Sequence, residues 1–303
     1  MDYRELCLLW AARETGIIDA VTFRAGTPAE VADETDVTER AARITLSAMD
    51  ELGFLECVNG EYEATNRALG LFAKTDVRSI GTVPHQMDCL DRWFALPETM
   101  RTGRPPESSD EWTANFMGAM ATIDDATVRT CVTEAVHENP DAERVLDIGG
   151  GPGSFSKEFA RRGYDVTLFD RPDVIDVDKT FLEHEPLELV PGDATDDLPT
   201  EFHLAFCSRV AHALGPAENR ALSKNVYDAL EPGGVAVFID KVRGWADDAA
   251  LFGAHMLAQT ENGDTYTEDQ FEGWFDNAGF DAVEIRDVPG TNQQAIVGYR
   301  PRH

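Results

Sequence analysis

The fold of this chain is decided by the stretch Arg144-Val145-Leu146-Asp147-Ile148-Gly149-Gly150-Gly151-Pro152-Gly153. A short apolar strand runs into a glycine-rich turn, and residues 154–162 have the pattern of the helix that follows. A strand–turn–helix unit of this kind brings backbone N–H groups and the positive end of a helix close to a ligand. The stretch therefore predicts a nucleotide-like cofactor at the turn.

The details of the turn distinguish between cofactors. A dinucleotide fingerprint reads G-x-G-x-x-G, and its third glycine allows the helix to pack closely on the strand. Gly149 and Gly151 fit this pattern, but the third position is Ser154 and an additional glycine, Gly153, precedes it. A carboxylate at Asp147 would repel a pyrophosphate, whereas it suits a ligand with ammonium and sulfonium charges. NAD binding and a tight turn without a ligand are the alternatives.

A second acid follows the turn at a typical distance. Asp170 closes the apolar run 165–169, about 20 residues beyond the glycines, where an acid hydrogen-bonds ribose hydroxyls in doubly wound folds. The turn and the two acids together resemble motif I and the next strand end of class I S-adenosylmethionine-dependent methyltransferases. The resemblance implies S-adenosylmethionine as the cofactor, with Arg171 beside it.

Strand and helix patterns alternate from residue 144 onward, which predicts a Rossmann-like, doubly wound α/β sheet over residues 139–303. The apolar runs lie at 144–148, 165–169, 187–190, 203–207 and 235–239. A capping box at 267–270 then opens a helix that ends near Ala278. Two strands follow, around 282–286 and 295–299, and the short turn between them predicts an antiparallel hairpin.

Residues 1–80 have the pattern of a winged helix. Helix starts at Thr27-Pro28 and Thr38 precede two short strand patterns that Asn59-Gly60 joins as a type I′ turn. Winged helices often bind DNA, but the expected recognition helix, residues 38–53, carries more acids than bases, and a DNA-reading surface is basic. The N-terminal apolar residues exceed what an exposed helix needs, which predicts a dimer; they are Leu6, Leu9, Trp10, Ile17 and Ile18.

Residues 81–138 are predicted to be a helical segment between these domains, with a break at 102–106. Most of its large apolar side chains are expected in the core. Phe116, Met117 and Met120 are the ones that we expect to face the substrate.

The ligand crevice of an open α/β sheet lies beyond the carboxyl ends of its strands. Three segments of the sequence fall there. Gly192-Asp193-Ala194 follows the third strand, Cys207-Ser208-Arg209 ends the fourth with His212 just beyond it, and Asp240 ends the fifth. An exposed turn aspartate without a ligand remains the alternative for Asp193.

The region after the fourth strand carries a more specific resemblance. The runs 212–216, 224–230 and 232–234, together with the Asn-Phe-Met-x-x-Met segment at 115–120, resemble the plant small-molecule and acetylserotonin-type O-methyltransferases. The resemblance spans nearly the whole chain. It implies that His212 is the general base, that Asp240 is the acid flanking it, and that the N-terminal domain joins two copies. It also implies cofactor contacts from the strand ends, at Asp193, Ala194, Ser208 and Arg209.

The chain departs from that family at three places. Ala213 and Leu214 replace an Asp-Trp pair, and Asp240 is one methylene shorter than the family glutamate. A second family acid corresponds to Thr265, with Glu261 and Asp264 close to it but out of register. Whether Asp240 or a residue near Thr265 supports the base is therefore open.

A neutral imidazole is well matched to removing a proton from a phenolic or enolic hydroxyl near pH 7. The sulfonium is already an activated methyl donor, so in-line placement of the nucleophile supplies much of the rate. A loop histidine without a role is the alternative for His212. His85, His203 and His255 are interpreted as packing or surface residues.

The net charge of the chain indicates its environment and disfavours one class of partner. The chain has 56 acidic against 26 basic residues, a net charge of −30, and only five lysines. Repulsion of this size destabilises a compact state in dilute buffer but is screened at molar salt, where the Debye length is about 3 Å. This favours a salt-rich, haloarchaeal cytoplasm over an ordinary acidic cytosolic protein. Nucleic-acid binding is disfavoured, since affinity for phosphate depends on Lys and Arg.

Length and cysteine usage agree with a cytoplasmic protein. The 303 residues suffice for two domains, no run of 18 apolar residues predicts a membrane span, and the N-terminus lacks a signal-peptide pattern. Five scattered cysteines argue for a reduced compartment and against a zinc site or a disulfide framework.

The sequence as a whole predicts a homodimeric S-adenosylmethionine-dependent O-methyltransferase that acts on a small aromatic or polycyclic metabolite and holds no metal. N- or C-methylation, or a relative that binds the cofactor without methylating, are the alternatives within the enzyme class. A winged-helix regulator that senses the cofactor is the alternative from another class.

Overall fold

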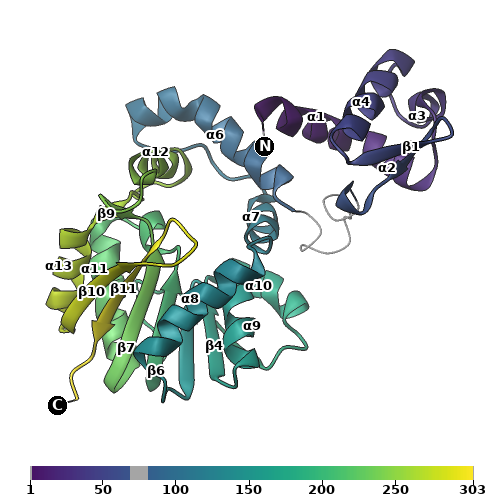
Figure 1. The fold of residues 1–303 in the computed structure, drawn as a ribbon. Helices are drawn as coiled ribbons and strands as arrows, with labels where there is room; N and C mark the ends of the chain where they lie inside the picture. The colour runs from purple at the N-terminus through teal and green to yellow at the C-terminus, as the bar shows by residue number, and fades with distance from the viewer. Residues whose placement is uncertain (1, 69–80, 303) are drawn as a thin grey trace. The chain divides into compact units, whose positions relative to one another are not determined.

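A computed structural model describes residues 2–68 and 81–302 and divides the chain into two compact units (Figure 1). The first unit comprises Met1–Asp91 and Ser108–Thr122, and the second comprises Arg92–Glu107 and Ile123–His303. The helical segment 81–138 is thus divided between both units, because α6 (Val83–Thr102) contributes to each of them. The expected boundary at residue 80 lies outside the described residues.

The first unit is built from short helices and one hairpin, in the predicted order. Besides α6, its elements are α1 (Tyr3–Glu14), α2 (Ile17–Phe23), α3 (Pro28–Glu34), α4 (Glu39–Glu51), β1 (Leu55–Val58), β2 (Glu61–Ala64) and α7 (Trp112–Met120). The predicted caps are present, since Thr27 and Thr38 accept hydrogen bonds from the first turns of α3 and α4. Asn59 and Gly60, with φ of 56° and 92°, turn the chain between the antiparallel strands.

The N-terminal apolar stripe lies mostly inside this unit. Leu9, Ile17 and Ile18 are at most 5% exposed and pack in its core. The expectation that a dimer buries the stripe is therefore wrong for these three residues, because their own unit buries them. Tyr3 and Phe23, which are 70% and 76% exposed, are the large apolar side chains that this end of the chain presents to solvent.

The second unit contains a seven-stranded sheet with the strand order β10-β11-β7-β6-β3-β4-β5. Its parallel strands are β3 (Arg144–Ile148), β4 (Asp165–Asp170), β5 (Leu187–Pro191), β6 (Phe202–Ser208) and β7 (Leu230–Asp240). β11 (Gln294–Tyr299) runs antiparallel to both β7 and β10 (Asp281–Asp287). The Rossmann-like fold with an antiparallel hairpin is confirmed, and β11 is the strand that joins the hairpin to the parallel sheet.

Helices cover both faces of the sheet (Figure 1). On one face lie α8 (Asp125–Glu138) and α9 (Ser154–Arg161), and on the other lie α11 (Pro216–Ala229) and α13 (Glu268–Ala278). α10 (Pro172–Phe181) packs on β4 and β5. The remaining short elements beyond β6 are η2 (Ala211–Ala213), β8 (Val242–Arg243), α12 (Ala249–Gln259) and β9 (Tyr266–Thr267).

One predicted turn lies inside a strand. The apolar run at 235–239 predicts a strand that starts at Val235, but β7 starts at Leu230 and includes the glycines at 233 and 234. Leu230 pairs with Phe202 and Val235 pairs with Leu204, so residues 231–234 form an irregularity between two bonded pairs. A φ of 85° at Gly233 allows the chain to bend there without leaving the sheet.

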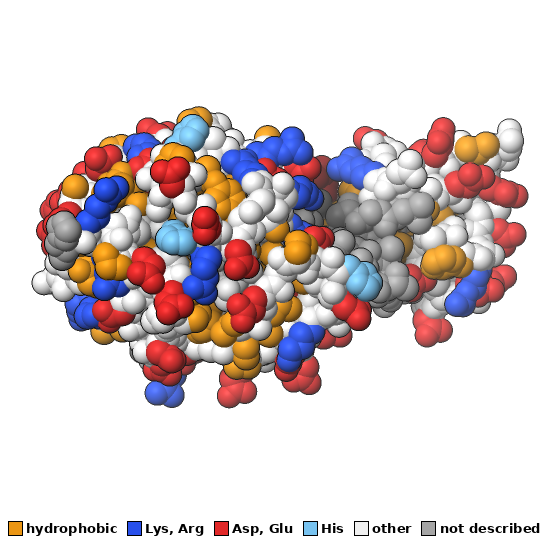
Figure 2. Space-filling view, turned by 90° about the horizontal axis from the view of Figure 1, so that it is seen from below, with side chains coloured by type: hydrophobic (Ala, Val, Ile, Leu, Met, Phe, Trp, Pro, Cys, Tyr) orange, Lys and Arg blue, Asp and Glu red, His pale blue; other side chains and the backbone are white. Residues whose placement is uncertain are grey.

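Acidic side chains are numerous on the surface, as the net charge of −30 implies. Figure 2 shows Asp and Glu side chains distributed over the visible face rather than gathered in one patch. None of the helices in the described part of the chain has the length and apolar character that crossing a bilayer requires.

Candidate active site

The glycine turn after β3 has a backbone conformation that residues with a side chain rarely adopt. Gly149, Gly151 and Gly153 all have positive φ, of 67°, 50° and 69°. A Cβ on Gly149 would lie 2.3 Å from Cγ2 of Val210, so no larger residue fits there. A Cβ on Gly151 would meet no atom of the described residues within 4 Å. The turn therefore packs tightly at Gly149 and leaves free space at Gly151.

Asp147 lies beneath this turn rather than in open solvent. It is 1% exposed, and its Oδ2 accepts a hydrogen bond of 2.5 Å from the Ser156 hydroxyl at the start of α9. Burial raises the pKa of Asp147 to about 7, and the nearby Asp170 adds to the rise. The hydrogen bond links the end of β3 to α9, and a positive charge nearby would lower the raised pKa of Asp147.

Asp170 ends β4 beside the same turn. Its two carboxyl oxygens accept hydrogen bonds from the backbone N–H groups of Gly151, at 2.9 Å, and Arg171, at 2.7 Å. Burial nevertheless raises the pKa of Asp170 above its usual value. The Arg171 guanidinium turns to Asp173 instead and pairs with it at 2.9 Å. The geometry fixes Asp170 next to the free space at Gly151.

Asp178 is a third acid near the turn, and sequence reasoning missed it. It lies on α10, is 0% exposed, and its carboxyl oxygens accept no hydrogen bond within the described residues. Burial raises the pKa of Asp178 to about 8, with Asp170 and Asp147 adding to the rise and Lys157 opposing it. The signal available in the sequence was an acid in helical register with the apolar Val174 and Leu182.

Side-chain hydrogen bonds hold the segment after β5 in place. Asp193 is exposed, and its Oδ1 accepts hydrogen bonds from the backbone N–H and the hydroxyl of Thr195, at 2.8 and 2.7 Å. The Ala194 carbonyl accepts a hydrogen bond of 2.9 Å from the Asn225 side chain on α11. The turn is therefore preformed and anchored to α11.

Ser208 and Arg209 lie where β6 ends. Ser208 is 7% exposed, and its hydroxyl has no partner among residues 2–68 and 81–302. Arg209 has a φ of 63°, which is strained for a residue with a side chain. Its guanidinium donates to Gln293 at 3.3 Å, and burial lowers its pKa.

The structure brings His212 and Asp240 into direct contact. His212 Nδ1 lies 2.7 Å from Asp240 Oδ1, and the backbone N–H of His212 donates to Asp240 Oδ2 at 3.1 Å. The backbone N–H of Lys241 donates to Oδ1 as well, at 2.8 Å. The side chains are 14% and 3% exposed. Asp240 therefore fixes both the position and the orientation of the His212 ring.

The second acid expected near Thr265 does not reach this pair. Thr265 is buried, and its hydroxyl donates to the Ala249 carbonyl at 2.9 Å. Asp264 forms an ion pair with Arg243. Among the residues that the structure describes, Asp240 is thus the carboxylate that contacts His212.

A second histidine borders the pair. The ring of Phe252 meets His212 edge to face, with centroids 4.9 Å apart, and stacks on His255 at 5.8 Å. The Trp93 indole N–H donates to His255 Nδ1 at 3.1 Å. Lys241 Nζ lies 4.7 Å from the centre of the Phe252 ring. The interpretation of His255 as a packing residue missed these contacts, because Trp93 is far away in the sequence.

The remaining expected residues lie elsewhere. His203 accepts backbone hydrogen bonds at the start of β3, which fits its packing role. Phe116, Met117 and Met120 lie on α7 in the first unit. Met117 is fully buried, whereas Phe116 and Met120 are partly exposed. Phe116 contacts the ring of His85 at 5.4 Å.

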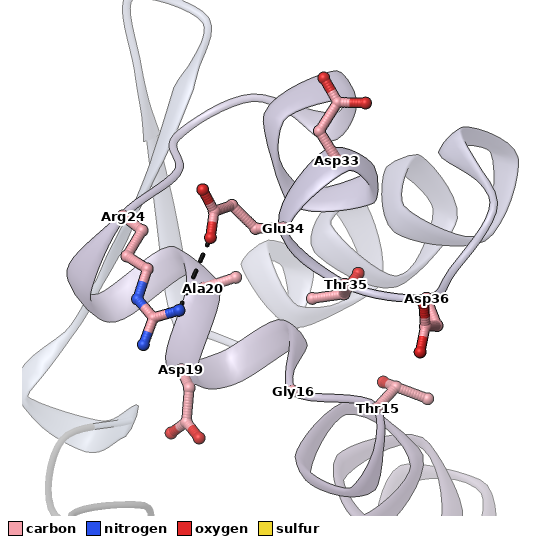
Figure 3. Close-up of a pocket in the computed structure, with 9 residues that line it drawn as sticks. All are labelled: Thr15, Gly16, Asp19, Ala20, Arg24, Asp33, Glu34, Thr35 and Asp36. Carbon is pink, nitrogen blue, oxygen red and sulfur yellow. Dashed lines mark ion pairs between the residues drawn. The ribbon is translucent and has the colours of Figure 1, made fainter.

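The first unit also has a surface hollow of about 380 Å³ (Figure 3). Acidic side chains dominate it, and Arg24 pairs with Glu34 across it at 3.6 Å. Its lining residues are Thr15, Gly16, Asp19, Ala20, Arg24, Asp33, Glu34, Thr35 and Asp36. None of these belongs to the predicted site.

The chain is similar to known methyltransferases in sequence and in fold. Residues 120–285 match the methyltransferase-domain family. The 8-O-methyltransferase of tetracenomycin polyketide synthesis from Streptomyces glaucescens is 26% identical, over 94% of this chain and 91% of the relative. The 3-hydroxy-5-methyl-1-naphthoate 3-O-methyltransferase from Streptomyces sahachiroi is 25% identical, over 94% and 89%. The crystal structure of human N-acetylserotonin methyltransferase with bound S-adenosylmethionine has a TM-score of 0.76 at 21% identity, covering 99% and 94%.

Proposed function

This chain belongs to the methyltransferase-domain family, and on that premise we propose that it methylates a hydroxyl group of a small aromatic or polycyclic acceptor with S-adenosylmethionine. Relatives that are named O-methyltransferases align over nine-tenths of the chain, and two of them are named for a polyketide and a naphthoate. This favours oxygen over nitrogen or carbon as the methylated atom.

The residues at the glycine turn fit a cationic nucleoside. Asp170 is fixed beside the space at Gly151, and an acid at this position suits ribose hydroxyls. The buried carboxyls of Asp147 and Asp178 favour a positive charge nearby. Further cofactor contacts are assigned by resemblance, at Gly149, Gly153, Arg171, Asp193, Ala194, Ser208 and Arg209. When bound there, S-adenosylmethionine supplies an activated methyl group.

His212 is the proposed general base. The observation that carries this role is the 2.7 Å contact between His212 Nδ1 and Asp240 Oδ1 at the carboxyl edge of the sheet. A carboxylate only accepts hydrogen bonds, so Nδ1 carries the hydrogen and Nε2 presents a lone pair. Nε2 then takes the proton of the acceptor hydroxyl as its oxygen becomes the nucleophile. Asp240 stabilises the imidazolium that forms.

The direct test is mass spectrometry of a metabolite extract incubated with the protein and a methyl donor carrying an isotopic label. We expect one acidic phenol or enol to gain one labelled methyl group. His212→Ala should strongly lower the amount of that product, whereas His184→Ala, which changes an exposed histidine, should leave it unchanged. Labelling of an amine or a carbon atom would refute O-methylation.

The first unit is proposed to be a winged-helix module that joins two copies and does not bind DNA. Exposed Tyr3 and Phe23 support an apolar contact, and the acids of α4 oppose DNA binding. Light scattering in molar KCl should report twice the mass of one chain, and Phe23→Glu should lower it. A monomer at micromolar concentration would contradict the proposal. Exposed Cys7 and Cys57 fit a reduced, cytoplasmic setting.

A further inference from the structure

Two histidine rings contact one aromatic ring, that of Phe252, in the second unit. Phe252 and His255 lie three residues apart on α12, and their rings stack with a centroid distance of 5.8 Å. His212 contacts the same ring, at a centroid distance of 4.9 Å and an angle of 83°. Phe252 therefore contacts both imidazoles at the carboxyl edge of the sheet.

The partners of the two rings impose opposite tautomers. Asp240 accepts from His212, which places the hydrogen of that ring on Nδ1 and leaves a lone pair on Nε2. The indole nitrogen of Trp93 can only donate, and it donates to His255 Nδ1 at 3.1 Å. The lone pair of His255 is thus on Nδ1, and its hydrogen is on Nε2.

His255 also stays neutral. Burial lowers the pKa of His255, and the neighbouring His212 and Lys241 lower it further. A neutral ring with Trp93 at Nδ1 is a hydrogen-bond donor at Nε2 and does not compete with His212 as a base.

Both outer nitrogens are available. Neither His212 Nε2 nor His255 Nε2 has a hydrogen-bond partner in the described ranges 2–68 and 81–302. Because both rings contact Phe252, one region of the protein offers a lone pair that can take a proton and an N–H group that can donate to an oxygen.

We propose that His255 Nε2–H binds a carbonyl oxygen next to the hydroxyl that His212 deprotonates, so that the acceptors are aromatic ortho- or peri-hydroxycarbonyl compounds. This rests on the O-methylation proposed above. In such compounds the hydroxyl donates to its own carbonyl, which holds the proton and hinders methylation. A donor from the protein replaces that internal hydrogen bond at the carbonyl and frees the hydroxyl proton for His212. His255 keeps its own proton throughout.

Two isomers separate this role from general packing. The peri isomer, 1-hydroxyanthraquinone, has its hydroxyl beside a carbonyl, and 2-hydroxyanthraquinone has the same atoms without that neighbour. We expect the wild-type protein to prefer the peri isomer in kcat/KM. His255→Phe keeps an aromatic ring against Phe252 and removes the donor. It should lower kcat/KM for the peri isomer by about 5- to 100-fold, the effect of leaving a buried carbonyl unpaired, and change the other isomer little.

A rescue variant provides a further kinetic test. His255→Gln supplies a side-chain N–H and should recover part of the activity toward the peri isomer. Equal losses for both isomers, or a wild-type preference for 2-hydroxyanthraquinone, would overturn the substrate assignment. In those cases methylation itself would still be observed, so the general function would stand.

The tautomers are tested without any acceptor. Nitrogen-15 NMR of the histidine-labelled protein distinguishes ring nitrogens that carry a hydrogen from those that carry a lone pair. We expect His255 with its hydrogen on Nε2 and His212 with its hydrogen on Nδ1, assigned with His255→Phe and His212→Ala. Trp93→Phe should shift the His255 signals alone and lower activity toward the peri isomer. The same tautomer in both rings would overturn the proposal.

Discussion

Three hydrogen bonds to one carboxylate define the proposed base. Asp240 accepts from the ring of His212, from its backbone N–H and from the backbone N–H of Lys241. The side chain and the main chain of the loop are thus tied to the same two oxygens. Asp240 is one methylene shorter than the glutamate of the resembling family. It still contacts the imidazole of His212, because the backbone N–H of His212 also donates to it and keeps the loop close.

His212→Ala should therefore leave affinity for S-adenosylmethionine nearly unchanged and lower turnover by about 10²–10⁴-fold. Part of the loss should return at high pH, where the acceptor hydroxyl ionises unaided. Asp240→Asn should do less damage, since it misorients the base without removing it. Methyl transfer measured across pH for both variants, with His184→Ala as the control, checks this. Wild-type turnover of His212→Ala at neutral pH would leave proximity as the mechanism.

The effect of Asp178 on the free energy of unfolding depends on pH. Its pKa in the folded protein, about 8, is above its ordinary value, so the folded state binds a proton more tightly than the unfolded state. The contribution to stability is most favourable at low pH and is lost as pH rises through the interval up to about 8. Asp178→Asn should thus be more stable than wild type by about 1–3 kcal/mol at pH 8.5, with a smaller difference at pH 5.

Denaturant unfolding in molar KCl at these two pH values measures the difference. Asp176→Asn changes an exposed acid on the same helix and should show no comparable dependence on pH. A stability gain that is equal at both pH values would mean that the charge of Asp178 is not its cause.

At the scale of elements, the glycine turn offers a pair of matched substitutions. Gly151→Ala places a Cβ in free space at a φ of 50°, so it should cost about 1–2 kcal/mol of backbone strain and leave the fold intact. If the cofactor occupies that space, calorimetry should show weakened binding of S-adenosylmethionine. Gly163→Ala, at a φ of 96° and outside the turn, is the control for strain alone. Unchanged affinity in Gly151→Ala would move the cofactor away from the turn.

Elements with local signals could be predicted from the sequence. The capping box at Thr267 begins α13, and the turn residues at 289–290 separate β10 from β11, as expected. The irregularity at 231–234 could not be predicted, because a glycine turn has the same local pattern within a strand as between elements. The contact of Trp93 with His255 spans 162 residues, and no periodicity reports such a pairing.

At the scale of the whole molecule, the net charge governs how stability depends on salt. The chain has a net charge of −30, and acids are spread over the face that Figure 2 shows. Repulsion between these charges opposes compaction, and salt screens it. The midpoint of thermal unfolding should rise steeply between 0.1 M and molar KCl. Sorbitol at equal osmolality is the control, because it is uncharged and does not screen. A midpoint that is flat or falls with KCl would remove the interpretation as a salt-adapted protein.

The position of β11 has a consequence for the order of events during synthesis. Asp240, at the end of β7, is paired in the sheet with Gln294, and the side chain of Gln294 accepts a hydrogen bond of 2.9 Å from the backbone of Val242. A ribosome has therefore finished the glycine turn and the histidine loop well before the strand that braces Asp240 emerges. In nascent chains that end before residue 294, Asp240 should lack this support, so its contact with His212 should form only late in synthesis.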